Sequence, residues 1–95
     1  MDLAKPLRAA QTRLRRADHE AATARRDLDL AAAGYDRARR ERTNVDRARA
    51  AWGVALITWT HLLIAREQAK DAVALERRDT DRSADVALMM PKDPT

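Results

Sequence analysis

The 95-residue chain has no cysteine and no phenylalanine, and it has only two glycines, three prolines and one tyrosine. Without cysteine it forms neither a disulfide nor a thiolate metal site. Sheets favour β-branched and aromatic residues separated by turns that contain glycine or proline, and both are scarce here. A composition dominated by Ala, Arg, Leu, Asp and Glu is typical of long helices. The sequence therefore predicts an all-α protein.

The sequence also lacks the residue clusters on which catalysis usually depends. It has no glycine-rich phosphate loop, and neither His19 nor His61 has a second histidine or a carboxylate at metal-ligand spacing on a helix. The segment 79–83 begins like a calcium loop, but Ala84 replaces the glycine of the turn. We therefore predict that the protein is not an enzyme and that it holds no cofactor and no metal ion.

An uncharged stripe runs through the first half of the chain. Its members recur every three or four residues, although 36% of the chain is charged. This spacing is that of a coiled-coil seam, and its many alanines let a partner helix approach closely. The ten positions are Leu7, Ala10, Leu14, Ala17, Ala21, Ala24, Leu28, Ala31, Tyr35 and Ala38.

A second stripe follows the polar run 39–44. It comprises Val45, Ala48, Trp52, Ala55, Trp59, Leu62, Ala69 and Val73. We predict a single helical domain with a helix over about 6–41, a turn over about 42–44, a helix over about 45–78, a short helix over about 81–90 and a tail over 91–95. Because the turn has no glycine or proline, one continuous helical rod is the alternative to this hairpin.

An apolar segment at 50–65, AAWGVALITWTHLLIA, lies between Arg49 and Arg66. Its apolar residues fall on every side of a helix, whereas a surface helix carries one apolar stripe. The segment must therefore be surrounded by other protein or by lipid. We predict a long helical hairpin, or antiparallel coiled coil, that assembles into an oligomeric bundle. The expected protein interface consists of Trp52, Leu56, Ile57, Trp59, Leu62, Leu63 and Ile64.

Insertion into a membrane, as in a small holin-like protein, is the first alternative. A spanning helix needs about twenty apolar residues, whereas sixteen residues at about 1.5 Å each reach about 24 Å. The segment also contains Thr58, Thr60 and His61. Its two tryptophans share one helix face instead of marking the two membrane interfaces. The sequence therefore favours burial in protein over burial in lipid.

Nucleic-acid binding is the second alternative, because the positive charge is concentrated in the first half. The chain has a net charge of +4, and residues 1–49 contain thirteen Lys and Arg against eight Asp and Glu. Phosphate contacts from such residues weaken steeply with salt. Acidic residues are interleaved with the arginines, so this reading is not favoured. The candidate contact residues are Arg37, Arg39, Arg40 and Arg42.

These patterns favour a structural or protein-interaction role for the chain, as an assembly protein, an adaptor or a virion-type subunit. The opening residues have no apolar core of the kind found in signal peptides, so we expect a cytoplasmic protein or a component of an assembled particle. The many arginines among alanines indicate a GC-rich genome of bacterial or phage origin. The partner is expected to be a second copy or a larger protein assembly.

Overall fold

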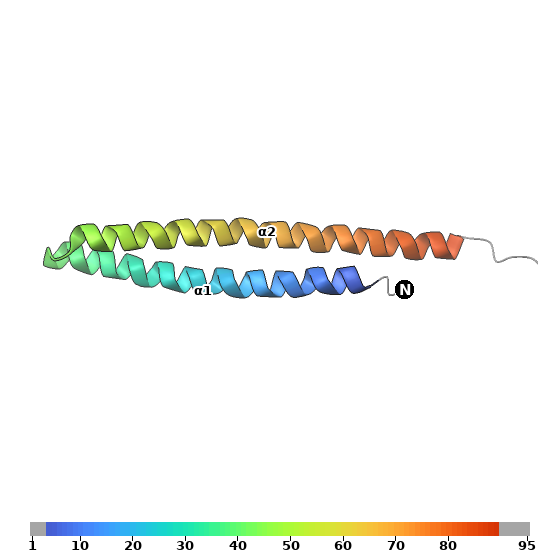
Figure 1. Cartoon of the computed structure of the whole chain (residues 1–95), viewed down its shortest axis with the longest axis horizontal. Helices are drawn as coiled ribbons and strands as arrows, with labels where there is room; N and C mark the ends of the chain where they lie inside the picture. The colour runs from blue at the N-terminus through green and yellow to red at the C-terminus, as the bar shows by residue number, and fades with distance from the viewer. Residues whose placement is uncertain (1–3, 90–95) are drawn as a thin grey trace, which may run out of the picture.

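The chain folds into a hairpin of two long antiparallel helices. The computed structural model describes residues 4–89, with side chains for residues 4–86. Helix α1 spans Lys5–Glu41 and helix α2 spans Val45–Met89, and residues 42–44 join them (Figure 1). The molecule measures 85 × 14 × 13 Å along its principal axes. The predicted all-α hairpin is confirmed, and the continuous rod is wrong.

Helix α2 continues without interruption through the segment where we predicted a break. It contains 45 residues and extends beyond the N-terminal end of α1 (Figure 1). The separate helix predicted over about 81–90 is therefore the C-terminal end of α2. No glycine or proline lies between Gly53 and Pro91 to end the helix, and the polar residues Asp81 and Ser83 are exposed on it. Residue 90 and the predicted tail at 91–95 lie outside the described residues.

The turn between the helices is built without glycine. Arg42 and Asn44 have positive φ angles of 52° and 54°. The N–H of Thr43 donates to the carbonyl of Ala38 at 3.1 Å, as in a Schellman motif, whose left-handed position is usually a glycine. The carbonyl of Asn44 accepts from the N–H of Ala48 at 3.0 Å and so begins the hydrogen bonds of α2. Asparagine adopts the left-handed region readily, whereas the arginine is strained by roughly 1–2 kcal/mol.

The two stripes seen in the sequence face each other in the hairpin. All ten stripe positions of α1 and all eight of α2 are buried or half-buried. The core is nevertheless thin, because alanine contributes little apolar area and therefore little hydrophobic stabilisation. The buried residues are Ala10, Ala21, Ala24, Leu28 and Ala38 of α1 and Val73 of α2.

Aromatic contacts reinforce this thin core in the half of the hairpin nearer the turn. The ring of Tyr35 in α1 stacks on that of Trp52 in α2, with centroids 5.9 Å apart and planes 8° apart. The guanidinium of Arg25 lies 5.0 Å from the ring centroid of Trp59, a cation–π contact. Both tryptophans of α2 are thus held by side chains of α1.

Arg66 interrupts the α2 stripe between Leu62 and Ala69. Its Nε lies 4.0 Å from Oδ1 of Asp18 on α1, and this is the one ion pair between the helices that we find among the described residues. The same Nε is buried and has no hydrogen-bond partner. Because a buried N–H without a partner costs free energy, we expect Arg66 to weaken the helix pairing at this point.

Candidate protein-interaction surface

Helix α2 has two apolar faces within the segment 50–65, and only one of them contacts α1. The eight stripe residues that pack against α1 form its inner face. A second set follows the same spacing of three and four residues, displaced by two positions. Two positions correspond to about 200° around a helix, so this second set points away from α1. We call it the outer face; it consists of Ala50, Val54, Ile57, His61 and Ile64.

The outer face is open to solvent in the hairpin. The exposed fractions of Val54, Ile57 and Ile64 are 66%, 59% and 52%. Leu56 lies beside them with an exposed fraction of 36%, so the apolar surface continues onto one flank of α2. Contiguous exposed apolar surface of this kind marks interaction sites in soluble proteins.

The seven predicted interface residues do not all lie on the same face of α2. Trp52, Trp59 and Leu62 are half-buried on the inner face, so α1 already covers part of each. Ile57 and Ile64 are exposed on the outer face, as is Leu56 on its flank, while Leu63 is half-buried. Part of the apolar segment is therefore covered within one chain, and part stays exposed to solvent.

Val54 is missing from the seven predicted interface residues, although it is the most exposed large apolar side chain of the segment. A signal for it was present in the sequence. Ala50, Val54, Ile57, His61 and Ile64 repeat the spacing of the inner stripe two residues later. The segment contains two separate apolar stripes, but they are not distinguished when it is described only as apolar on all sides.

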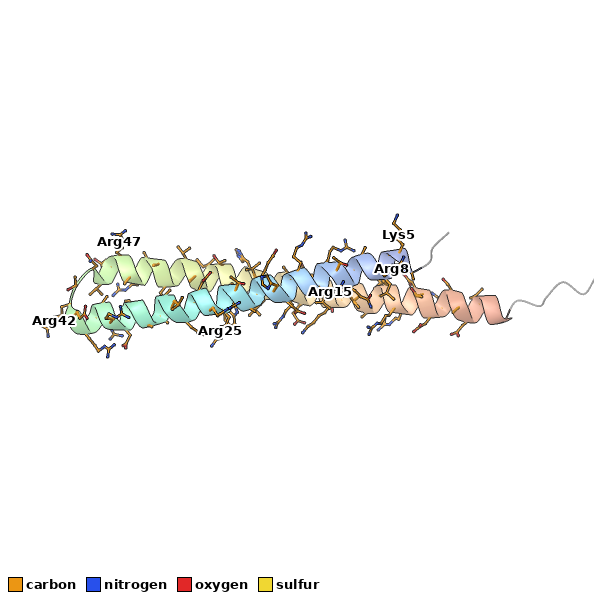
Figure 2. All side chains as sticks on the ribbon, turned by 90° about the horizontal axis from the view of Figure 1, so that it is seen from below. Lys5, Arg8, Arg15, Arg25, Arg42 and Arg47 are labelled. Atoms are coloured by element: carbon orange, nitrogen blue, oxygen red, sulfur yellow. The ribbon has the colours of Figure 1, made fainter. Side chains whose placement is uncertain are left out.

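Arginines from both helices gather at the turn, where Arg42 and Arg47 lie at the same end of the hairpin (Figure 2). The four predicted nucleic-acid contact residues, Arg37, Arg39, Arg40 and Arg42, are all exposed there. The charge is partly compensated, because a carboxylate oxygen of Asp36 lies 3.5 Å from the guanidinium of Arg40. The turn is therefore a basic end with interleaved acidic residues.

The ring of Tyr35 contacts one of these arginines, Arg39, and also Arg49 of α2. The guanidinium groups of Arg39 and Arg49 lie 5.7 Å and 5.9 Å from its centroid. Arg49 Nε also donates a hydrogen bond to the Tyr35 hydroxyl at 3.2 Å, and this hydrogen bond raises the pKa of Arg49. The single tyrosine is thus occupied by contacts within the hairpin, on one side by Trp52 and around its edge by arginine.

The two histidines lie on different helices and in different surroundings. His19 of α1 lines a shallow groove with Glu20 and Asp27, facing Thr58 of α2. His61 lies on the outer face of α2 and is exposed. Within residues 4–89 we find no group of three His, Cys, Asp or Glu side chains placed to hold a metal ion. Apolar contact and charge are the chemistry that this surface offers.

One helix of the described chain, the stretch Val45–Val86 of α2, is long and apolar enough to cross a membrane by length and composition alone. In the hairpin, α1 runs beside it and carries the exposed charges of Arg25, Asp27 and Asp29. A charged side chain at the centre of a bilayer costs about 2.5–3.5 kcal/mol even on the most lenient scale. A hairpin that spanned a bilayer with both helices would therefore place these charges in hydrocarbon, unless α2 separated from α1.

Comparison of the chain with family models, with curated proteins and with solved structures gave no match. Its function therefore has to be inferred from its own geometry and chemistry.

Proposed function

We propose that this chain is a non-enzymatic structural or protein-interaction component, which joins a protein assembly through the outer face of α2. The observation that carries the proposal is the exposure of Val54, Ile57 and Ile64 on a helix whose other face is already paired. The assembly would be a cytoplasmic complex or a particle such as a virion.

A protein partner accounts for the composition of the outer face better than solvent does. Covering a large aliphatic side chain is worth about 1.5–3 kcal/mol when it is fully exposed beforehand, and three such side chains here are more than half exposed. The thin, alanine-rich core of the hairpin gives the chain little stability of its own. Association would therefore stabilise the fold as well as build the assembly.

A protein partner is also favoured over a membrane. A protein can cover the outer face while α1 stays paired with the inner face. Lipid would surround a membrane-spanning α2 on all sides, which would require the loss of the Tyr35–Trp52 stack and of the Arg25–Trp59 contact. The outer face also contains His61, which can hydrogen-bond within a protein interface but finds no partner in hydrocarbon.

Photo-crosslinking in the producing cells tests this function directly. We would replace Ile57 by p-benzoylphenylalanine, irradiate the cells and determine the mass of the adducts. Leu30 of α1, with an exposed fraction of 73%, is the control position, because it lies outside the outer face. We expect protein adducts at position 57 and none of comparable yield at position 30. Adducts to lipid alone, or no adducts at position 57, would contradict the proposal.

A second candidate function is supported by the basic end of the hairpin. The turn brings Arg47 of α2 to the groove that Arg37 lines, and Arg49 of α2 to the Tyr35 ring that Arg39 contacts, which adds positive charge to the cluster seen in the sequence. A phosphate backbone is the natural ligand for such a cluster. If the end binds nucleic acid, affinity for a DNA duplex should fall steeply with salt, and a variant with Arg39→Ala and Arg40→Ala should flatten that dependence. Binding too weak to detect at low salt would remove this candidate.

A further inference from the structure

We infer that the partner of the outer face is a second copy of this chain, paired antiparallel with α2 against α2 of the partner. This inference rests on the proposed function and adds the identity, orientation and register of the partner. The two copies are related by a two-fold axis level with Trp59, so that the outer face of one copy packs along the same side of α2 in the other copy.

The charges at the two ends of the outer face determine the orientation. Continuing its spacing of three and four residues leads to Arg47 at one end, and to Gln68 and Asp71 at the other. A parallel pair would place Arg47 opposite its own copy and Asp71 opposite its own copy. An antiparallel pair places Arg47 opposite Asp71 of the partner at both ends. Opposite charges attract and like charges repel, so the antiparallel pair is favoured.

The apolar residues determine the register. With the axis level with Trp59, Val54 meets Ile64 of the partner and Ile57 meets His61 of the partner, and each of these layers occurs twice. Ala50 then lies opposite Gln68, just inside the charged pair. A register one heptad shorter would place Arg47 against Ile64 and would leave Asp71 beyond the start of the partner's α2. The longer overlap therefore satisfies both the apolar residues and the charges.

The helix geometry keeps the outer face continuous over this length. The inner face follows a repeat of three and four residues from Val45 to Val73, along which α2 stays in contact with α1. The outer face has the same repeat, two residues later, so it stays opposite to α1 along the whole overlap. A second copy can therefore pack on α2 without displacing α1, giving four helices in the order α1, α2, α2, α1.

Disulfide trapping tests the orientation, because the chain contains no cysteine of its own. We would prepare two single-cysteine chains, Ala50→Cys and Gln68→Cys, and oxidise each alone and then both mixed. In the antiparallel dimer these positions face each other, so the mixture should give a covalent dimer of one chain of each kind, and each chain alone should give little. Efficient linking of each chain to itself would show a parallel pair and overturn the inference.

Light scattering coupled to size exclusion tests the partner itself. The purified chain should have twice the chain mass of 10.7 kDa without detergent. Ile57→Glu should reduce this to a single chain, because the new carboxylate lies in the apolar overlap, whereas Leu30→Glu should remain a dimer. Circular dichroism would confirm that both variants stay helical. A wild-type chain that remains a single chain at the concentration used for disulfide trapping would overturn the inference.

The masses from photo-crosslinking at position 57 separate this inference from the proposed function. Adducts of twice the chain mass would agree with both the protein-interaction role and a second copy as the partner. Adducts to another protein alone would overturn the second copy and leave the protein-interaction role in place. The absence of protein adducts would overturn both.

Discussion

The inner and outer faces of α2 are built from similar residues at the same spacing, yet they differ in what covers them. On the inner face, Trp52 and Trp59 contact Tyr35 and Arg25 of α1. On the outer face, Val54, Ile57 and Ile64 point away from α1 and are more than half exposed. The chain supplies one partner helix for two apolar faces. The spacing of apolar residues therefore shows which residues share a helix face. Which of the two faces stays exposed depends on which one α1 covers.

The largest expected effect distinguishes the two faces by stability. Trp59→Ala removes a half-buried ring and its contact with Arg25, so we expect a loss of about 2 kcal/mol in the free energy of unfolding, less than the 3–5 kcal/mol typical of a fully buried aromatic. Ile57→Ala on the outer face should change the stability of a single chain by about 0.5 kcal/mol or less.

Urea unfolding would measure the free energy of unfolding of Trp59→Ala and of Ile57→Ala. It would be done at high dilution, where association contributes nothing. If Ile57→Ala cost as much as Trp59→Ala under these conditions, α1 would be covering both faces and the distinction between them would be lost.

The next prediction concerns Arg66, the charged interruption of the inner face. Arg66→Leu replaces a buried Nε that lacks a hydrogen-bond partner by an apolar side chain that continues the stripe. We expect the free energy of unfolding to rise by about 1 kcal/mol, the lower end of the cost of a buried unsatisfied donor, because the Arg66 side chain is still one-third exposed.

Arg77→Leu is the matched control for Arg66→Leu, since Arg77 is exposed on the same helix. It should leave the urea midpoint nearly unchanged. A drop in the midpoint for Arg66→Leu would mean that the 4.0 Å pairing with Asp18 outweighs the unsatisfied donor.

Much of the fold could be predicted from the sequence, because periodicity and helix pairing have the same physical cause. The hairpin buries or half-buries all eighteen stripe positions. The end of α2 was not predictable in the same way. Asp81 and Ser83 favour helix caps but are also tolerated in a helix when exposed, and no stop signal follows before Pro91.

The candidate site was only partly predictable, for a different reason. The apolar segment marked α2 as a helix with too much apolar surface, but the division into two faces depends on where α1 lies. Val54 was not predicted because the segment has apolar residues on all sides of the helix. The side that stays exposed is known only when the position of α1 is known. Arg42 was a candidate phosphate contact under an alternative that the sequence does not favour. Its strained place in the turn could not be predicted from residue type, since glycine usually occupies that position.

The third prediction strengthens the hairpin without touching either face of α2. Arg42 has φ of 52°, a conformation that glycine adopts without strain. Arg42→Gly should raise the free energy of unfolding by about 1 kcal/mol, since relief of strain is partly offset by the greater freedom of glycine in the unfolded chain. Arg40→Gly, in the last turn of α1, should instead lower it, because glycine is a poor helix former.

Thermal unfolding monitored by circular dichroism would measure the stability of Arg42→Gly and Arg40→Gly. If the outer face alone governs association, the mass of the assembly should be the same in both variants. A change in that mass with Arg42→Gly would show that the turn also takes part in the interface.

The smallest expected effect compares the two glycines, which both lie inside helices with no atom of the other helix within 4 Å of where a Cβ would stand. Gly34→Ala and Gly53→Ala should each stabilise an isolated hairpin by about 0.5–1 kcal/mol, because alanine is the better helix former. Gly53 precedes Val54 and borders the outer face, so a partner packed closely there would meet the added methyl group. Gly53→Ala should then weaken association, measured by dilution, while Gly34→Ala should leave it unchanged. Equal behaviour of the two variants in association would mean that the partner does not approach the backbone of α2 at Gly53.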